Sequence, residues 1–326
     1  MMFEKRDTVF HGQEAINLSL PGMELIVLKT FLRIVHLGPN LAQNLLYIDT
    51  DRKFMRGQWV LYGGHRIWFG LPGADEHHGA YTPDAGPIEV KERLDGNIES
   101  IVFTAPPDAM QIVKGFVIRP LADGLVEVEN FVANGGDMLA AGGVWPITCT
   151  NPVSTEAFYV TRLNTGNPGW DAPVINHFPT WGGGHQTSAE GDGQFSRDII
   201  NGQWLHTLRP EGLEAKRAFT SAFGAQAMVM PKLNLTLFKI APPFDHRQPY
   251  LIPGCNAAMY AGPYARTENA GPAMVEMEDV GPAVQLYPGE SVSLSVLFSL
   301  ATQAIVPAEC DFSPFNRENF LKSLPR

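Results

Sequence analysis

Cysteine is scarce in this chain, and long apolar runs are missing. The three cysteines, Cys149, Cys255 and Cys310, are far apart, and no CxxC pair or Cys/His metal spacing occurs. An odd number of separated thiols is a poor disulfide framework, so we expect a reduced, cytoplasmic protein. The N-terminal residues MMFEKRDTVF are polar where a signal peptide would have its apolar core. No apolar run approaches the roughly 18 residues that cross a bilayer, so we expect no membrane partner.

Positive charge is scarce as well. The chain has 24 Lys and Arg against 34 Asp and Glu, a formal net charge of -10 at pH 7. Nucleic-acid phosphates require a Lys/Arg-rich face, so the sequence argues against a nucleic-acid partner and favours a weakly charged small molecule. A glycine-rich phosphate loop and a GxSxG elbow are both missing, which argues against dinucleotide chemistry and serine hydrolysis.

The chain is rich in short β-branched and aromatic stretches that are separated by glycine and proline. Its 32 Gly and 26 Pro punctuate the sequence about every ten residues, a pattern typical of sheets, and the fold class predicted is all-β. An Asp-Gly pair at 123–124 predicts a hairpin. Residues 210–221 and 314–323 are the only predicted helices. The predicted strands are residues 24–28, 34–37, 45–48, 59–62, 98–104, 112–118, 125–131, 157–161, 233–240, 257–260 and 292–300.

Two carboxylates alternate in a predicted strand near the C-terminus, within residues 274–291. Side chains in a strand alternate between faces, so Glu276 and Glu278 must share one face. A half-exposed strand with charged outer positions would show the same pattern. The spacing therefore leaves open both a surface strand and a functional carboxylate pair.

An arginine and a tryptophan follow two glycines in the segment 63–68. Arg66 offers a fork of donors and Trp68 an apolar face, a pair that commonly holds a hydroxylated ring. A structural Arg beside a core Trp is the alternative. Trp145 and Thr148 are candidates for a second wall of such a pocket, although core packing explains Trp145 equally well.

Two long Gly/Pro/Trp-rich segments, residues 72–86 and 164–193, are predicted to be loops, which at this length are often functional. In the first, Tyr81 and Asp84 are the candidates to reach a pocket. Its adjacent residues His77 and His78 point apart in an extended chain, so we expect no metal site.

The second loop carries possible proton-transfer groups. His177 and His185 flank Trp181 and three successive glycines, so this loop is a candidate to close over a ligand. A solvent-exposed turn with incidental histidines fits equally well.

The order of these motifs resembles the galactose-mutarotase-like superfamily, which includes the aldose 1-epimerases. The resemblance implies a β-supersandwich of two large twisted antiparallel sheets with few short helices, a single domain over residues 1–326, a carbohydrate ligand and no cofactor. It leaves a homodimer open. The matching pieces are residues 23–27, 33–34, 43–46, 63–68, 128–130, 144–148, 253–256, 275–278, 281–282 and 288–291.

The resemblance also implies roles for the carboxylates. In such enzymes a Glu near the C-terminus takes the proton from the anomeric hydroxyl, and a His protonates the ring oxygen. Glu278 would be the base, and Glu276 would tune it or bind a hydroxyl. Arg66 would hold the sugar.

The acid has no direct counterpart in this sequence. In the family it lies in an Asn-His-Ser-Tyr-Phe type segment, and the corresponding residues 145–151 contain no histidine. His65, His177 and His185 are the candidates, and Lys239 or Tyr260 would be substitutes.

Three functions follow from this sequence. The first is an epimerase or mutarotase-type isomerase that binds a sugar or sugar acid in a concave β-sheet site, with Trp68, Trp145 or Trp181 as the stacking wall. The second is a non-catalytic carbohydrate-binding protein on the same scaffold, which the missing acid favours. The third is a polysaccharide lyase, which would need a basic groove that the excess of acidic residues disfavours.

Overall fold

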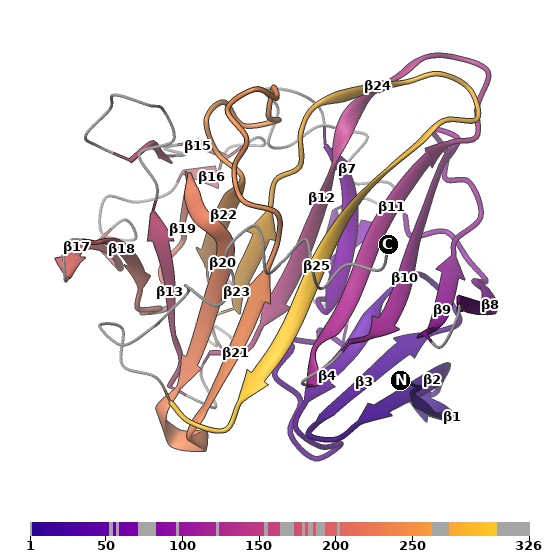
Figure 1. Ribbon diagram of the computed structural model, residues 1–326, viewed down its shortest axis with the longest axis horizontal. Coiled ribbons are helices and arrows are strands. Elements are labelled where there is room, and N and C mark those ends of the chain that lie inside the picture. Colours follow the sequence, from indigo (N-terminus) through magenta and orange to yellow (C-terminus); the bar gives the residue numbers. More distant parts are fainter. Residues whose placement is uncertain are drawn as a thin grey trace.

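The structure, a computed structural model, describes most of the chain and consists almost entirely of strands. Two large antiparallel sheets pack face to face (Figure 1). Within the described ranges there is no α-helix and no helix that is long and apolar enough to cross a membrane, and the 3-10 turn η4 spans Pro231–Leu233. The predicted all-β class with two large antiparallel sheets is confirmed. The described residues are 2–51, 55–56, 59–70, 83–95, 98–121, 124–152, 156–163, 173–177, 180–181, 185–186, 193–200, 203–262 and 274–304.

The first sheet has 11 strands in the order β1-β2-β3-β4-β7-β12-β23-β22-β19-β14, with β24 also paired to β12. Strands that lie side by side in its centre are distant in the sequence. There β12 lies between β7 and β23. Its strands are β1 (Glu4–Phe10), β2 (Gln13–Leu20), β3 (Met23–Leu28), β4 (Ile34–Gly38), β7 (His65–Gly70), β12 (Ala140–Thr150), β14 (Ile175–His177), β19 (Ala215–Phe219), β22 (Ala257–Gly262), β23 (Met274–Asp279) and β24 (Val284–Leu286).

The second sheet has 10 strands in the order β17-β18-β13-β20-β21-β25-β11-β10-β9-β8. Two short pairs, β5 (Met55–Arg56) with β6 (Trp59–Val60) and β15 (Thr180–Trp181) with β16 (His185–Gln186), lie outside both sheets. The strands of the second sheet are β8 (Glu89–Asp95), β9 (Ile98–Thr104), β10 (Ile112–Pro120), β11 (Val126–Asn134), β13 (Phe158–Leu163), β17 (Phe195–Ile200), β18 (Gln203–Leu208), β20 (Ser221–Met230), β21 (Leu235–Ile240) and β25 (Ser291–Ala301).

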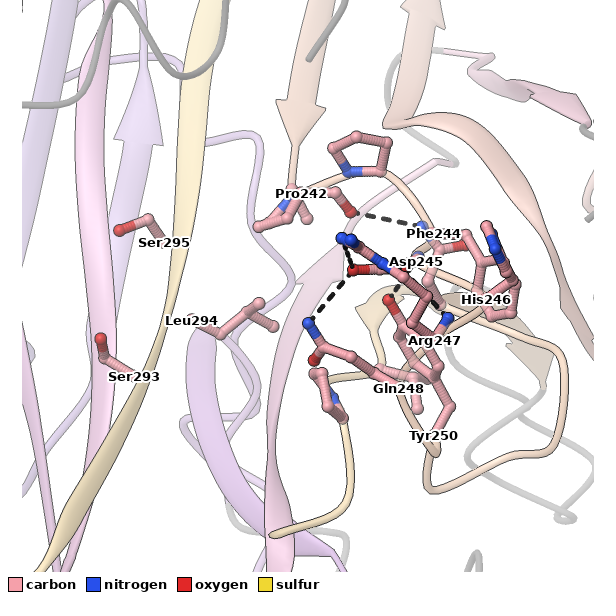
Figure 2. Close-up of a pocket in the computed structure, with 15 residues that line it drawn as sticks. Pro242, Phe244, Asp245, His246, Arg247, Gln248, Tyr250, Ser293, Leu294 and Ser295 are labelled. Carbon is pink, nitrogen blue, oxygen red and sulfur yellow. Dashed lines mark hydrogen bonds and ion pairs between the residues drawn. The ribbon is translucent and has the colours of Figure 1, made fainter. Parts of the chain in front are cut away.

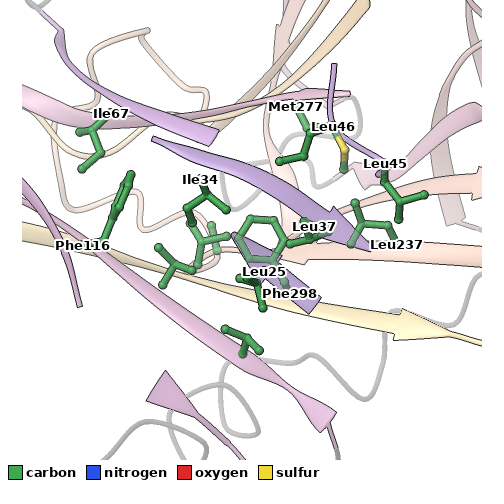
Figure 3. Packing of buried hydrophobic residues seen from close by; sticks show 14 of the residues in the cluster. Leu25, Ile34, Leu37, Leu45, Leu46, Ile67, Phe116, Leu237, Met277 and Phe298 are labelled. Atoms are coloured by element: carbon green, nitrogen blue, oxygen red, sulfur yellow. The ribbon is translucent and has the colours of Figure 1, made fainter. Parts of the chain in front are cut away.

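The main hydrophobic core fills the space between the two sheets. Ile67 and Met277 of the first sheet belong to the same buried cluster as Phe116, Leu237 and Phe298 of the second (Figure 3). Burial of each such side chain contributes roughly 1.5–3 kcal/mol. Because strand side chains alternate, the residues next to these in sequence are turned away from the core. The outer face of the first sheet therefore carries residues 66, 276 and 278.

Most predicted strands are present, and one predicted helix is wrong. The strand predicted at 98–104 is β9, and β10 pairs with β11 from Ile112↔Asn134 to Pro120↔Val126, which confirms the predicted hairpin. Residues 45–48 form only isolated bridges, and of 59–62 only Trp59–Val60 is a strand. Residues 210–221 contain β19 instead of a helix, because pairing with β14 and β22 overrides local helix propensity. The helix predicted at 314–323 lies outside the described residues.

Candidate functional site

Glu276 and Glu278 lie on the outer face of the first sheet, as their spacing predicts. Met277 lies between the two carboxylates in β23 and Val275 precedes them, and both belong to the core between the sheets. The outer face around the two carboxylates carries cations and indoles from neighbouring strands. We call this group the outer-face cluster; it consists of Arg66 and Trp68 from β7, Trp145 from β12, Lys216 from β19, and Glu276 and Glu278 from β23.

Arg66 holds the first carboxylate. Its Nη2 donates to Glu276 Oε1 at 3.0 Å, and its guanidinium carbon lies 4.3 Å from the Trp68 ring centroid, a cation–π contact. The Cys149 Sγ lies 3.4 Å from the same carboxylate oxygen. Burial, with the neighbouring Glu276, raises the pKa of Cys149, so this side chain is a protonated thiol that donates to the carboxylate.

Lys216 and Trp145 hold the second carboxylate. Trp145 Nε1 donates to Glu278 Oε2 at 2.9 Å, and Lys216 Nζ lies 3.0 Å from the same oxygen. Lys216 Nζ is also 5.1 Å from the Trp145 ring centroid. Ala258 is directly opposite Glu278 in the register, and Ala218 is opposite Ala258, so small side chains leave space for the lysine beside the carboxylate.

Burial and balanced charge characterise the cluster. All six side chains are buried, with Trp68 the most exposed at 6% and Glu278 at 0%. The two cations and two carboxylates cancel, which offsets the large cost of removing charges from water. In the conformation described here the cluster is enclosed, so binding of a sugar to it requires a conformational change.

His65 and Thr148 lie on the opposite face of the first sheet, between the two sheets. His65 Nδ1 is 2.8 Å from Thr148 Oγ1, and its Nε2 is 2.9 Å from Asn130 Oδ1 of β11. The rings of Phe116 and Phe298 lie 5.5 Å from the imidazole. A neutral imidazole satisfies both bonds, because Nε2–H donates to the amide oxygen while Nδ1 accepts from the hydroxyl. The structure therefore does not bring His65 together with the carboxylates.

The buried imidazole predicts a pH dependence of stability. Burial, aided by the positive charge of Lys239, lowers the pKa of His65 to about 3, whereas the unfolded chain titrates near the ordinary value of about 6.5. Between about pH 3 and pH 6.5 the His65 imidazole is protonated in the unfolded chain and neutral in the folded protein. The free energy of unfolding should thus fall on acidification from about pH 6.5 toward pH 3, by up to about 1.4 kcal/mol per pH unit.

Urea denaturation of the wild type and of His65→Gln at several pH values between 4 and 7 isolates this contribution. The amide can bond to Thr148 and Asn130 but has no titratable proton. We expect a shallower decline of stability in the variant. Parallel pH profiles for the two proteins would contradict the assignment.

Lys239 also lies between the sheets. From β21 of the second sheet its Nζ reaches the first sheet, 2.7 Å from Asp279 Oδ2, and it donates to the carbonyls of Met277 at 2.5 Å and Pro146 at 3.3 Å. Both charged groups are fully buried; burial lowers the pKa of Lys239 and raises the pKa of Asp279. Lys239 therefore holds β12 and β23 from behind the outer-face cluster and does not lie on its face.

Two further predicted site residues, Tyr260 in β22 and Asp84 in the segment before β8, lie in described parts of the chain. Tyr260 is opposite Glu276 in the register of β22 and β23, and its Oη donates to Glu214 Oε1 at 2.9 Å. It therefore lies next to the outer-face cluster. Asp84 forms an ion pair with the buried Arg33, whose Nη1 also donates to the carbonyl of Gly63 at 3.1 Å.

The remaining candidates are described only as backbone or not at all. His177 pairs with Arg217 at the β14 edge of the first sheet, one residue from Lys216. Trp181 pairs with His185 in the short β15–β16 ladder. Their side chains, and Tyr81 as a whole, lie outside the described residues. Among the side chains that are described, His, Cys, Asp and Glu form no group of three or more that could hold a metal ion.

Sequence reasoning missed Lys216. The residue lies in the segment predicted to be helical, and in the sequence nothing distinguishes it from a surface lysine. The register provides the missing information: Lys216 is opposite Tyr260, which is opposite Glu276. This places the lysine on the same face as both carboxylates.

Comparison with known proteins identifies the fold. No family model and no curated protein matches the chain. Among solved structures, a galactose mutarotase-like protein from Clostridium acetobutylicum is 10% identical with a TM-score of 0.54, covering 92% of this chain and 99% of that one. A galactose mutarotase-like protein from Lactobacillus casei is 11% identical with a TM-score of 0.54, covering 88% and 100%.

A TPR-domain containing protein from Parabacteroides distasonis is 14% identical with a TM-score of 0.59. The match covers 90% of this chain but only 48% of that protein, so this chain spans about half its length. Many structural neighbours are thus galactose mutarotase-like proteins, and the predicted resemblance is confirmed at the level of the fold.

Proposed function

We propose that this protein binds a sugar at the outer-face cluster and interconverts its anomers or epimers by proton transfer, with Glu278 as the base. The observation that carries the proposal is the convergence of Arg66, Glu276 and Glu278 on one sheet face beside Trp68 and Trp145. Carboxylates and a guanidinium bind sugar hydroxyls, and indoles stack on the C–H face of the ring. The fold is one that galactose mutarotase-like proteins share.

The contacts of Glu278 suit a base. The ammonium of Lys216 at 3.0 Å and the indole N–H of Trp145 at 2.9 Å both favour its ionised form. A carboxylate must be ionised to accept the anomeric proton. Ring opening then follows when the ring oxygen receives a proton, and rotation about the C1–C2 bond before reclosure gives the other anomer. Lys216 is the cation nearest this carboxylate among the described contacts and is our candidate for the acid that gives its own proton to the ring oxygen as the bond from C1 to that oxygen breaks.

The charge of the cluster indicates a neutral sugar. Two cations and two carboxylates leave no net positive charge among its described side chains. A uronate would need an additional cation to neutralise its carboxylate. This balance supports a neutral aldose over a sugar acid and weighs against a polysaccharide lyase.

A non-catalytic carbohydrate-binding protein is the second candidate. It is favoured by the position of His65, which faces the core instead of the cluster. Both carboxylates are also already engaged by cations. In this function the same side chains would bind hydroxyl groups without transferring a proton.

Anomer exchange by NMR tests the proposal. Purified protein is added to equilibrated glucose, galactose, mannose, xylose and arabinose, and the exchange rate between α and β anomers is measured against buffer alone. We expect at least one sugar to exchange faster with the protein. Binding without faster exchange across the panel would favour the second candidate and remove the isomerase proposal.

A further inference from the structure

A cavity lies at the second sheet, in the opening where β21 leaves β25. The last paired residues of these strands are Lys239↔Phe298 and Ile240↔Leu297. Beyond them, residues 291–296 of β25 pair with β11 on one side only among the described strands. The two strands diverge there (Figure 1). The opening contains a cavity of about 690 Å³.

One wall of the cavity is the open edge of β25. Ser293, Leu294 and Ser295 are consecutive, so their side chains point alternately to the two faces, yet all three line the cavity. The cavity therefore lies against the edge of the strand, and Asn256, Val280 and Pro282 line it from the side of the first sheet. The Ser295 hydroxyl already donates to Glu127 Oε1 of β11 at 2.7 Å.

The opposite wall is a polar segment that follows β21. Asp245, Arg247 and Gln248 extend from this segment toward β25 (Figure 2). Leu294 extends from β25 toward this wall, so the cavity has an apolar side chain on one side and polar groups on the other (Figure 2). No residue of the outer-face cluster lines it.

Hydrogen bonds hold this wall in place. Arg247 donates to both oxygens of Asp245, at 2.9 Å from Nε and 2.8 Å from Nη2, and Gln248 Nε2 donates to Asp245 at 3.4 Å. The Asp245 backbone N–H donates to Tyr250 Oη at 3.0 Å, and the Tyr250 ring stacks on Phe244 at 4.7 Å. A wall ordered in advance loses little entropy on binding.

The charges in the cavity cancel. The Arg247 side chain bonds to Asp245 and holds the pKa of that carboxyl well below its usual range, so the two form an ion pair at neutral pH. An anion or a cation would have to compete with that pair. A neutral ligand with many hydroxyl groups can instead bond to the outer edges of the pair and to the Gln248 amide.

We infer that this cavity binds a neutral carbohydrate, a monosaccharide or disaccharide, at a site separate from the outer-face cluster. Its volume lies within the about 300–1,000 Å³ of small-molecule sites. The inference goes beyond the proposed function and does not rest on it, because the two sets of lining residues are different. A protein with both sites would hold two sugar units at once.

Calorimetric titration with glucose, galactose, mannose, maltose and lactose tests the inference. Ser293→Leu places an apolar side chain in the cavity, and Gln248→Ala removes one polar wall group. Ser291→Leu is the matched control, because Ser291 lies on the same face of β25 but does not line the cavity. We expect at least one sugar to bind, roughly tenfold more weakly to each cavity variant, and unchanged to the control.

Glu278→Gln separates this site from the cluster. The binding component that Ser293→Leu weakens should persist in Glu278→Gln. The inference is overturned if no sugar of the panel binds, if Ser293→Leu binds like the control, or if binding is lost in Glu278→Gln and kept in Ser293→Leu. It is equally overturned if the open edge of β25 binds an extended peptide and no sugar.

Discussion

Replacement of Glu278 by glutamine should lower the rate of anomer exchange by about 10²–10⁴-fold, the usual contribution of a general base. Glutamine keeps the size of the side chain and an acceptor for Trp145 Nε1, 2.9 Å away in the wild type. It cannot accept the anomeric proton. The measurement is the exchange rate by NMR, at equal protein concentration and on a sugar that the wild type turns over. Unchanged catalysis would remove the assignment of Glu278 as the base.

The variant needs two controls, because it leaves the buried Lys216 without its carboxylate partner. Glu278→Gln combined with Lys216→Met removes both charges, so comparison with the single variant shows whether an isolated buried ammonium destabilises the fold. Its far-UV circular dichroism and unfolding transition report whether the fold is kept. Glu129→Gln is the matched carboxylate control, since Glu129 pairs with Arg119 on the second sheet. We expect this control to exchange anomers at the wild-type rate.

Replacement of Lys239 by methionine should lower the free energy of unfolding by about 3–5 kcal/mol. Lys239 Nζ lies 2.7 Å from Asp279, and both side chains are at most 1% exposed. Without the lysine, the carboxylate and the carbonyls of Met277 and Pro146 lose a buried donor. Urea denaturation followed by tryptophan fluorescence measures the change. A loss below about 1 kcal/mol would show that the pair does not hold the sheets together.

Two variants complete this experiment. Lys239→Met with Asp279→Asn removes both charges, and we expect the double variant to be more stable than the sum of the two single changes predicts, by about 0.5–3 kcal/mol. Lys232→Met is the matched surface control, because Lys232 pairs with Glu156 while both side chains remain more than half exposed. Its effect should stay below about 1 kcal/mol.

Alternation along single strands was predictable from the sequence. It placed Glu276 and Glu278 on one face, and the structure has them on one face of β23. The same rule puts His65 and Arg66 on opposite faces, because they are adjacent in β7. That signal was available, and it separates the two residues that sequence reasoning had assigned to one binding site. The order of the motifs also indicated the fold.

Other features could not be predicted from local patterns. The strand β19 was mistaken for a helix, since the closely spaced Glu and Lys of residues 210–221 favour helix when neighbouring strands are ignored. The edge strand β1 and its neighbour β2 were not predicted either. The cavity beside β25 depends on the point where β21 stops pairing, and no residue type marks that point.

By itself the sequence determined an all-β chain, its turns, and which residues share a face of each strand, because the side-chain period of two is a local property of extended backbone. Only the tertiary structure decided which face turns inward and which strands are neighbours, because those choices depend on burial summed over both sheets. The strand order β7-β12-β23-β22-β19 brings together Arg66, Trp145, Glu278 and Lys216. Arg66 and Glu278 are 212 positions apart in the sequence. Alternation determined which side chains share a face of a strand, and pairing between distant strands assembled the outer-face cluster.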